Sequence, residues 1–193
     1  MTKRIILGGL LAGLVMFIWG ALSHTFLDLY ASSVKSMPPD TEESVMARAN
    51  PGLKSPGFYL FPGMEDHKSA TPEQVKAWED KYRKGPRGIL VYQPEGTSPM
   101  GPPQLLRQLA CDLVVGLLAA LLLATASPLL SRFSARILFV MLLGALPWLT
   151  LSFPYWNWYG FPTDFTLVTL FDILLKFLFG GLVLAGIVKR PAA

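Results

Sequence analysis

The stretch TLFDILLKFLF, residues 169–179, is almost wholly apolar, yet it carries a carboxylate at Asp172 and an ammonium at Lys176. It lies within an apolar block that runs from residue 165 to residue 188. About 20 apolar residues are enough for a helix to cross the ~30 Å hydrocarbon layer of a bilayer. The stretch therefore predicts a membrane-spanning helix that carries two opposite charges on one face, because residues at i and i+4 share a helix face.

Three further apolar blocks of similar length lie at residues 5–22, 113–130 and 137–153. In lipid every backbone N–H and C=O must be paired within its own segment, so these blocks predict helices. With 52% hydrophobic residues in a chain of 193, too little polar sequence remains to cover four such helices in a soluble fold. We predict a mainly α membrane protein with four transmembrane helices and a small extracytoplasmic α+β insertion between helices 1 and 2.

The predicted boundaries follow from the apolar blocks and the turn residues between them. Residues 1–23 form transmembrane helix 1, residues 24–104 form the extracytoplasmic α+β domain, and residues 105–193 form a three-helix transmembrane region with helices at 105–130, 137–153 and 164–188. The first block is longer than the ~7–15 residue apolar core of a signal peptide, so we expect a retained anchor.

The charge distribution predicts the orientation of the chain. The net charge is +4, but residues 24–107 hold ten basic and ten acidic residues and are neutral. The excess lies beside the apolar blocks, at Lys3, Arg4, Arg132, Arg136, Lys189 and Arg190. Because Lys and Arg mark the cytoplasmic side, both termini are expected there. No basic stripe suited to phosphates is present, so no nucleic-acid partner is expected.

The insertion carries ordinary signals of helices and strands. Helix 1 is expected to continue through residues 24–34, and a second helix is expected to begin after Asp40 as N-cap and to end at Pro51. Thr71 with Gln74 three residues on predicts a capping box for a helix that ends at Gly85. Bounded aromatic and β-branched runs predict strands at residues 57–61 and 88–96.

Small residues and an aromatic segment mark the surfaces of the predicted membrane helices. Helices 1, 2 and 4 carry small-xxx-small pairs, which predict close helix contacts without naming the partner. The segment 154–164 is expected to be an outer turn whose Trp and Tyr side chains lie at the headgroup level, although such aromatics also suit a ligand. Pro147 is expected to kink the third helix.

Four ionisable residues are expected at similar heights in the outer leaflet. Counting ~1.5 Å per residue from the inner anchors places Lys176 about 10 Å deep and the other three near the outer boundary. The set is His24, Asp112, Asp172 and Lys176. The favoured interpretation is an internal ion pair between Asp172 and Lys176 that orients helix 4. Two alternatives stay open: a site for a polar headgroup, a quinone-like molecule or a partner subunit, and a proton or ion path.

No motif points to catalysis. The sequence holds no nucleophile elbow, P-loop or dinucleotide fingerprint, and its histidines have no spacing typical of a metal site. We therefore expect no catalytic residues, no metal and no cofactor.

Three stretches, VMFIWGALSHTFLDL (15–29), GFYLFPGM (57–64) and GILVYQPEG (88–96), resemble a group of uncharacterised small bacterial inner-membrane proteins. The resemblance implies a bacterial inner-membrane location and no particular activity. The expected function is that of a non-enzymatic accessory or assembly subunit of a larger membrane complex, with lipid and other membrane subunits as partners. The alternative is a lipid- or small-ligand-binding membrane protein that uses the outer-leaflet polar cluster.

Overall fold

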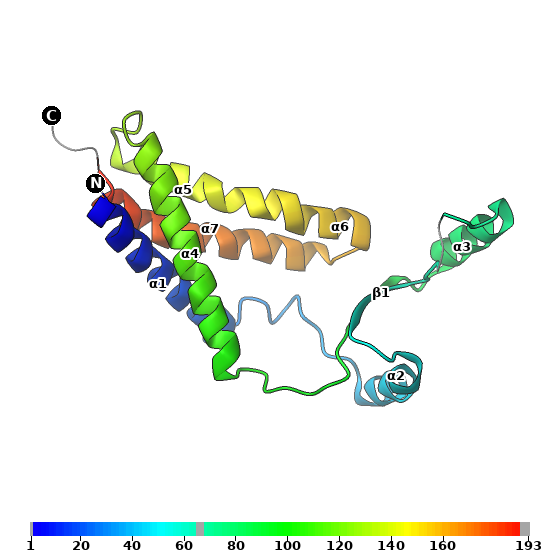
Figure 1. Cartoon of the computed structure of the whole chain (residues 1–193). Helices are drawn as coiled ribbons and strands as arrows, with labels where there is room; N and C mark the ends of the chain where they lie inside the picture. The colour runs from blue at the N-terminus through cyan, green and yellow to red at the C-terminus, as the bar shows by residue number, and fades with distance from the viewer. Residues whose placement is uncertain (1, 65–67, 190–193) are drawn as a thin grey trace. The chain divides into compact units, whose positions relative to one another are not determined.

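The computed structural model describes residues 2–64 and 68–189, which form long helices and a small two-stranded sheet (Figure 1). The chain divides into two compact units. The helical unit consists of Met1–Lys35 and Pro99–Ala193, and the smaller unit is Ser36–Ser98.

Within its described residues the helical unit contains four helical segments that are long and apolar enough to cross a membrane, as predicted. They are α1 (Thr2–Thr25), α4 (Pro102–Ala126), the continuous segment Phe133–Tyr159, and α7 (Thr163–Ile187). The third segment is built from α5 (Phe133–Pro147), a π-helical turn (Trp148–Ser152) and α6 (Phe153–Tyr159).

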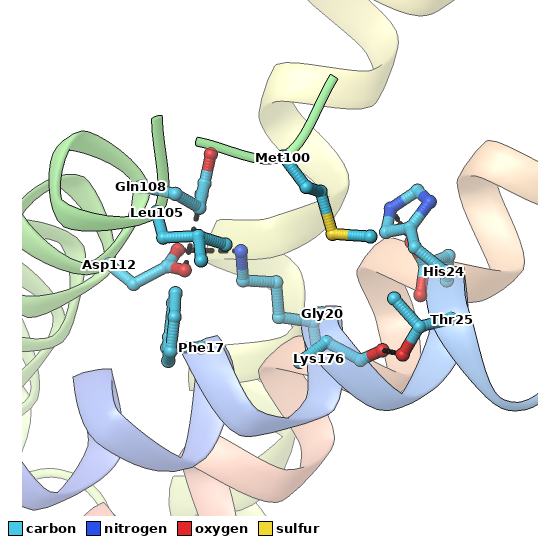
Figure 2. Close-up of a pocket in the computed structure, with 11 residues that line it drawn as sticks. Phe17, Gly20, His24, Thr25, Met100, Leu105, Gln108, Asp112 and Lys176 are labelled. Carbon is cyan, nitrogen blue, oxygen red and sulfur yellow. Dashed lines mark hydrogen bonds and ion pairs between the residues drawn. The ribbon is translucent and has the colours of Figure 1, made fainter. Parts of the chain in front are cut away.

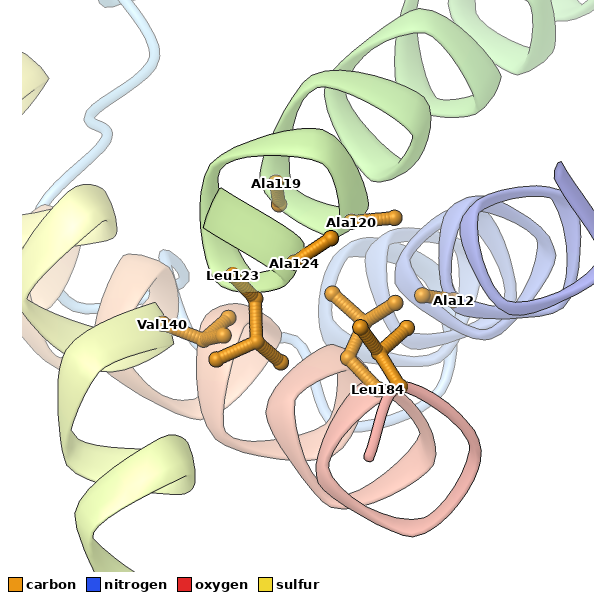
Figure 3. Close-up of a cluster of buried hydrophobic side chains, with 8 residues drawn as sticks. Ala12, Ala119, Ala120, Leu123, Ala124, Val140 and Leu184 are labelled. Carbon is orange, nitrogen blue, oxygen red and sulfur yellow. The ribbon is translucent and has the colours of Figure 1, made fainter. Parts of the chain in front are cut away.

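Helix α1 packs against both α4 and α7, and α5 packs on α7 (Figure 1). The buried apolar cluster lies where these helices meet, and it includes Ala12, Ala120, Leu123, Val140 and Leu184 (Figure 3). Many of the other large apolar side chains of these helices are exposed or only partly buried. An apolar outer surface around a small buried core suits helices surrounded by lipid, because lipid supplies no hydrophobic drive for burial.

Glycines allow α1 and α4 to approach so closely that their backbones are in contact. A Cβ at Gly13 would lie 2.6 Å from the Cα of Leu113, and a Cβ at Gly9 would lie 2.7 Å from the Cα of Leu117. From the other side, a Cβ at Gly116 would lie 2.6 Å from the backbone nitrogen of Gly13. The small-residue pattern of these two helices therefore marks their mutual contact.

Helix α1 ends earlier than predicted, at Thr25, and does not continue through residue 34. The N–H of Leu27 donates to the carbonyl of Leu22 at 2.9 Å, and Asp28 adopts a positive φ of 45°. Asp tolerates this left-handed conformation better than most residues. A residue in this conformation cannot continue a right-handed α-helix. The chain then turns so that the hydroxyl of Tyr30 reaches Asp172 of α7.

The third long apolar segment also differs from the prediction at both ends. Helix was expected at 137–153 with a turn over 154–164, but the chain is helical from Phe133 to Tyr159 and turns only at 160–162. Pro147 is followed by the π-helical turn, in which the N–H of Phe153 donates to the carbonyl of Trp148. A π turn of this kind lets a helix accommodate a local disturbance and continue. Helix α4 similarly runs over Pro102–Ala126 instead of 105–130.

The smaller unit contains an antiparallel pair of strands, β1 (Gly57–Phe61) and β2 (Gly88–Tyr92), with Phe58 opposite Val91. The predicted strand 88–96 stops at Tyr92, shortly before Pro94, which lacks the N–H that a strand ladder needs.

Two helices accompany the sheet, α2 (Pro39–Gly52) and α3 (Pro72–Lys84). Asp40 is not the N-cap of α2, because Pro38 takes that position and Pro39 opens the helix. Proline suits the first helical turn, where its missing N–H would be unpaired in any case. Pro51, at which the helix was expected to end, lies within it, and the helix ends one residue later at Gly52. The predicted Thr71–Gln74 capping box of α3 is confirmed in both of its hydrogen bonds.

The residues 36–98 should not fold as an isolated soluble fragment. Among the described residues of this unit only Tyr92 is a buried hydrophobic residue, and α3 buries none of its side chains. A two-stranded sheet with so little burial is marginal in water. We expect the fragment to show no cooperative thermal transition by circular dichroism and collapsed amide dispersion by NMR. A sharp transition with dispersed shifts would show that it needs neither membrane nor partner.

Candidate functional site

The polar residues singled out in the sequence meet at one pocket of the helical unit. His24, Asp112, Asp172 and Lys176 all line a pocket of about 280 Å³ (Figure 2). His24 comes from the end of α1, Asp112 from the first half of α4, and the other two from α7. Met100, which precedes α4, also lines the pocket and reaches toward His24.

Lys176 forms its ion pair with a different carboxylate from the one predicted. Its Nζ lies 2.6 Å from Oδ1 of Asp112, across the space between α7 and α4. Gln108, one turn before Asp112, donates from its side-chain amide to Oδ2 at 3.1 Å. The expected pairing of Lys176 with Asp172 within α7 is therefore wrong, because the packing of α4 brings a second carboxylate closer to the ammonium.

Asp172 is instead held by donors from α1 and the turn that follows it. The indole N–H of Trp19 donates to Oδ1 at 2.7 Å, and the hydroxyl of Tyr30 donates to Oδ2 at 3.0 Å. Nε2 of His24 lies 3.7 Å from the same Oδ2. Only 11% of the Asp172 side chain is exposed. Two neutral donors thus satisfy a carboxylate that has no lysine or arginine within ion-pair distance among the described residues.

Tyr30 connects this carboxylate to the residues around it. Its ring stacks on the His24 ring with centroids 4.7 Å apart and lies 5.7 Å from the Phe165 ring. Burial first, and then the negative charge of Asp172, raise the pKa of Tyr30 to about 12. Tyr30 therefore remains a protonated donor to Asp172 at any pH near neutrality.

The ionisation of Tyr30 should report its contact with Asp172. Because the pKa is raised from 10.0 to about 12, the contribution of Tyr30 to stability is complete below about pH 10 and is lost as pH rises through about 12. The phenolate absorbance at 295 nm is measured against pH for the unaltered protein and for Tyr30→Phe, and the difference reports Tyr30. We expect this difference to have its midpoint near pH 12. Circular dichroism over the same range checks that the protein is still folded. Asp172→Asn should lower that midpoint. A midpoint near 10 would contradict the buried contact.

The two groups of contacts connect neighbouring helices. Lys176–Asp112 joins α7 to α4, while Asp172–Trp19 joins α7 to α1. Both begin within one turn of α7, which carries Asp172 and Lys176 on the same face. The described residues bring together no group of three or more His, Cys, Asp or Glu side chains that would hold a metal ion.

Trp19, Tyr30 and Gln108 were not among the site residues predicted from the sequence. Gln108 could have been found, because an amide four residues before a carboxylate on a helix commonly bonds to it. Trp19 gave a weaker signal, since a buried indole N–H in an apolar segment needs an acceptor. Tyr30 gave none, because the segment that carries it was expected to be helical.

No model of a known protein family, no curated protein and no solved structure matches this chain.

Proposed function

We propose that this chain is a non-enzymatic, multi-pass membrane protein that binds a lipid or another small molecule in the pocket between α1, α4 and α7. The observation that carries the proposal is the convergence of His24, Asp112, Asp172 and Lys176, from three helices, on one pocket. Ligand sites are typically concave, mainly apolar and furnished with a few polar groups that fix orientation. Ionisable residues within membrane segments are costly, so their concentration at a pocket favours a function.

The walls of the pocket fit this proposal. Phe17, Met100 and Leu105 contribute apolar surface beside the polar groups. Gly20 and Ala21 give the α1 wall little side-chain volume, and a Cβ at Gly20 would meet no atom of the described chain within 4 Å. The pocket thus has room that packing has not filled, next to groups that bear charge.

Filling the pocket should expel the bound molecule. Gly20→Phe places a ring in the open space at the pocket wall, whereas Gly186→Phe adds the same ring in α7, where a Cβ also meets nothing within 4 Å and no pocket residue is changed. The protein is purified in mild detergent, extracted with organic solvent, and the extract is quantified by mass spectrometry. We expect one class of molecule to be enriched over the bulk membrane with the unaltered protein and Gly186→Phe, and lost with Gly20→Phe. Equal extracts from all three proteins would refute the proposal.

The location proposed for the protein is the bacterial inner membrane, with both termini in the cytoplasm and residues 24–104 outside. Support comes from the basic residues beside the inner ends of the spans, such as Lys3, Arg4 and Arg132. A phosphatase reporter, which is active only in the periplasm, should be inactive when fused after Ala193 and active when inserted between Gly96 and Thr97. The reverse pattern would overturn the orientation.

A second candidate function is that of an accessory or assembly subunit in a larger membrane complex. The observation that favours it lies in the smaller unit, where Phe58, Leu60 and Val91 share one face of the sheet and are each more than half exposed. An exposed apolar face in a unit with so little core suits contact with another protein. The mass of the intact particle released from native membranes separates the two functions, because a complex subunit would be released together with other protein chains.

A further inference from the structure

The carboxylates of the pocket already have donors within the protein. Oδ1 of Asp112 accepts from Lys176 and Oδ2 from Gln108, while the two oxygens of Asp172 accept from Trp19 and Tyr30. Their side chains are only 3% and 11% exposed. A ligand that enters the pocket therefore meets few open acceptors on these two residues.

Donors, in contrast, remain available to a ligand. The ammonium of Lys176 has three N–H groups, and the structure pairs it with Asp112 while leaving 20% of its side chain exposed. The His24 side chain is 57% exposed, and its Nε2 lies at 3.7 Å from Asp172, beyond hydrogen-bond distance. Among the described lining residues, Lys176, His24 and the second amide N–H of Gln108 thus present donors that a ligand oxygen would meet.

The charge of the pocket disfavours ionic ligands of either sign. Two carboxylates face one ammonium, so the sum is −1 with His24 neutral and zero with His24 protonated. An anion would gain no attraction from the net charge of the pocket. The ammonium that it could pair with is already neutralised by Asp112. A cation would be repelled by the Lys176 ammonium. The carboxylate oxygens that could attract it already accept hydrogen bonds from other donors. The ligand that fits best is neutral, largely apolar, and able to accept hydrogen bonds.

We propose, on the basis of the binding function above, that the pocket receives a carbonyl oxygen of a neutral group and that Lys176 donates to it. Two membrane molecules carry this chemistry, a quinone head group and the ester linkage of a lipid chain. A pocket of about 280 Å³ is at the small end for a complete ligand. It suits a head group or linkage, while the remaining hydrocarbon stays in the bilayer against Phe17 and Leu105.

The test compares pairs of ligands in which one member carries carbonyl groups and the other carries none. The full-length protein is placed in nanodiscs made of diether phospholipid, which has no ester carbonyl. One arm adds a decyl-substituted benzoquinone or its reduced quinol and measures binding by quenching of tryptophan fluorescence. The other adds the matched diester phospholipid and measures by native mass spectrometry which lipid is retained. We expect the quinone over the quinol, or the diester over the diether, to be preferred roughly 10- to 100-fold, the effect of one hydrogen bond to a charged donor. The arm that shows the preference identifies the source of the carbonyl.

The preference should depend on Lys176. In Asp112→Asn with Lys176→Met, which removes the ammonium together with its partner, we expect carbonyl and non-carbonyl ligands to bind equally. No preference in the unaltered protein, or an undiminished preference in the double variant, would overturn the inference.

Gly20→Phe separates a failure of this inference from a failure of the binding function. If the unaltered protein binds both members of a pair equally and Gly20→Phe binds neither, the pocket is a binding site for another ligand class. The binding function then stands while the carbonyl inference fails. If Gly20→Phe and the unaltered protein behave identically toward every probe, both proposals fail.

Discussion

Neutralising Lys176 alone, or Asp112 alone, should destabilise the helical unit by roughly 3 kcal/mol, and neutralising both should recover most of that loss. The pair is close, at 2.6 Å, and little exposed. Asp112→Asn leaves an ammonium without a counter-charge in an apolar setting, while Lys176→Met leaves a buried carboxylate with Gln108 as its remaining donor. Removing both charges leaves neutral side chains of similar volume, which is often neutral for stability.

A matched cycle tests whether Asp112 is the true partner. The same measurement is made with Asp172→Asn, Lys176→Met and their combination, since Asp172 lies four residues from Lys176 on the same helix. Stability is measured by thermal unfolding in one detergent, followed by tryptophan fluorescence. We expect a coupling energy of about 2–3 kcal/mol in the Asp112 cycle and a much smaller one in the Asp172 cycle, because directly contacting charges couple strongly. Strong coupling to Asp172 with none to Asp112 would restore the intrahelical pair.

Gly116→Ala should be as damaging as the loss of a buried charge, although it adds only one methyl group. The new Cβ would lie within 3 Å of backbone atoms of Gly9 and Gly13, and the backbone of a packed helix cannot move aside as a flexible side chain does. Overpacking of this kind typically costs about 1–3 kcal/mol, and more when the obstacle is rigid. Separation of α1 from α4 would also draw Asp112 away from Lys176. We therefore expect a lowered unfolding temperature together with reduced coupling in the Asp112–Lys176 cycle.

Gly186→Ala is the matched control, since a Cβ there meets no atom of the described chain within 4 Å. It removes a helix-interior glycine without a clash, so it should be neutral or slightly stabilising. If Gly116→Ala unfolds at the same temperature as Gly186→Ala, α1 and α4 do not approach as closely as the structure indicates.

The four long apolar helices and the grouping of the polar residues could be predicted from sequence because both depend on local information. Apolar runs of about 20 residues identify membrane helices, and a constant rise per residue fixes relative height along each helix. His24, Asp112, Asp172 and Lys176 were grouped on that basis, and they do line one pocket. The capping box at Thr71 was predictable for the same reason, since its two hydrogen bonds lie within four residues.

The partners within the site could not be predicted, because they depend on how the helices rotate and pack. The i, i+4 spacing favoured Asp172 for Lys176, but the close approach of α1 and α4 at Gly13 and Gly116 determines where Asp112 lies. Small-residue patterns predict contact without naming the partner helix. Tyr30 reaches Asp172 only because α1 stops at Thr25, and the turn at Asp28 has a backbone conformation that an apolar pattern does not reveal.

The most direct test of the binding pocket is the mass of the intact particle released from native membranes. We expect a mass equal to the protein plus one lipid or other small molecule per chain for the unaltered protein and for Gly186→Phe, and the mass of the protein without that molecule for Gly20→Phe. A particle composed of this chain with other protein subunits, and with no small molecule that Gly20→Phe displaces, would contradict the account and favour the accessory-subunit function.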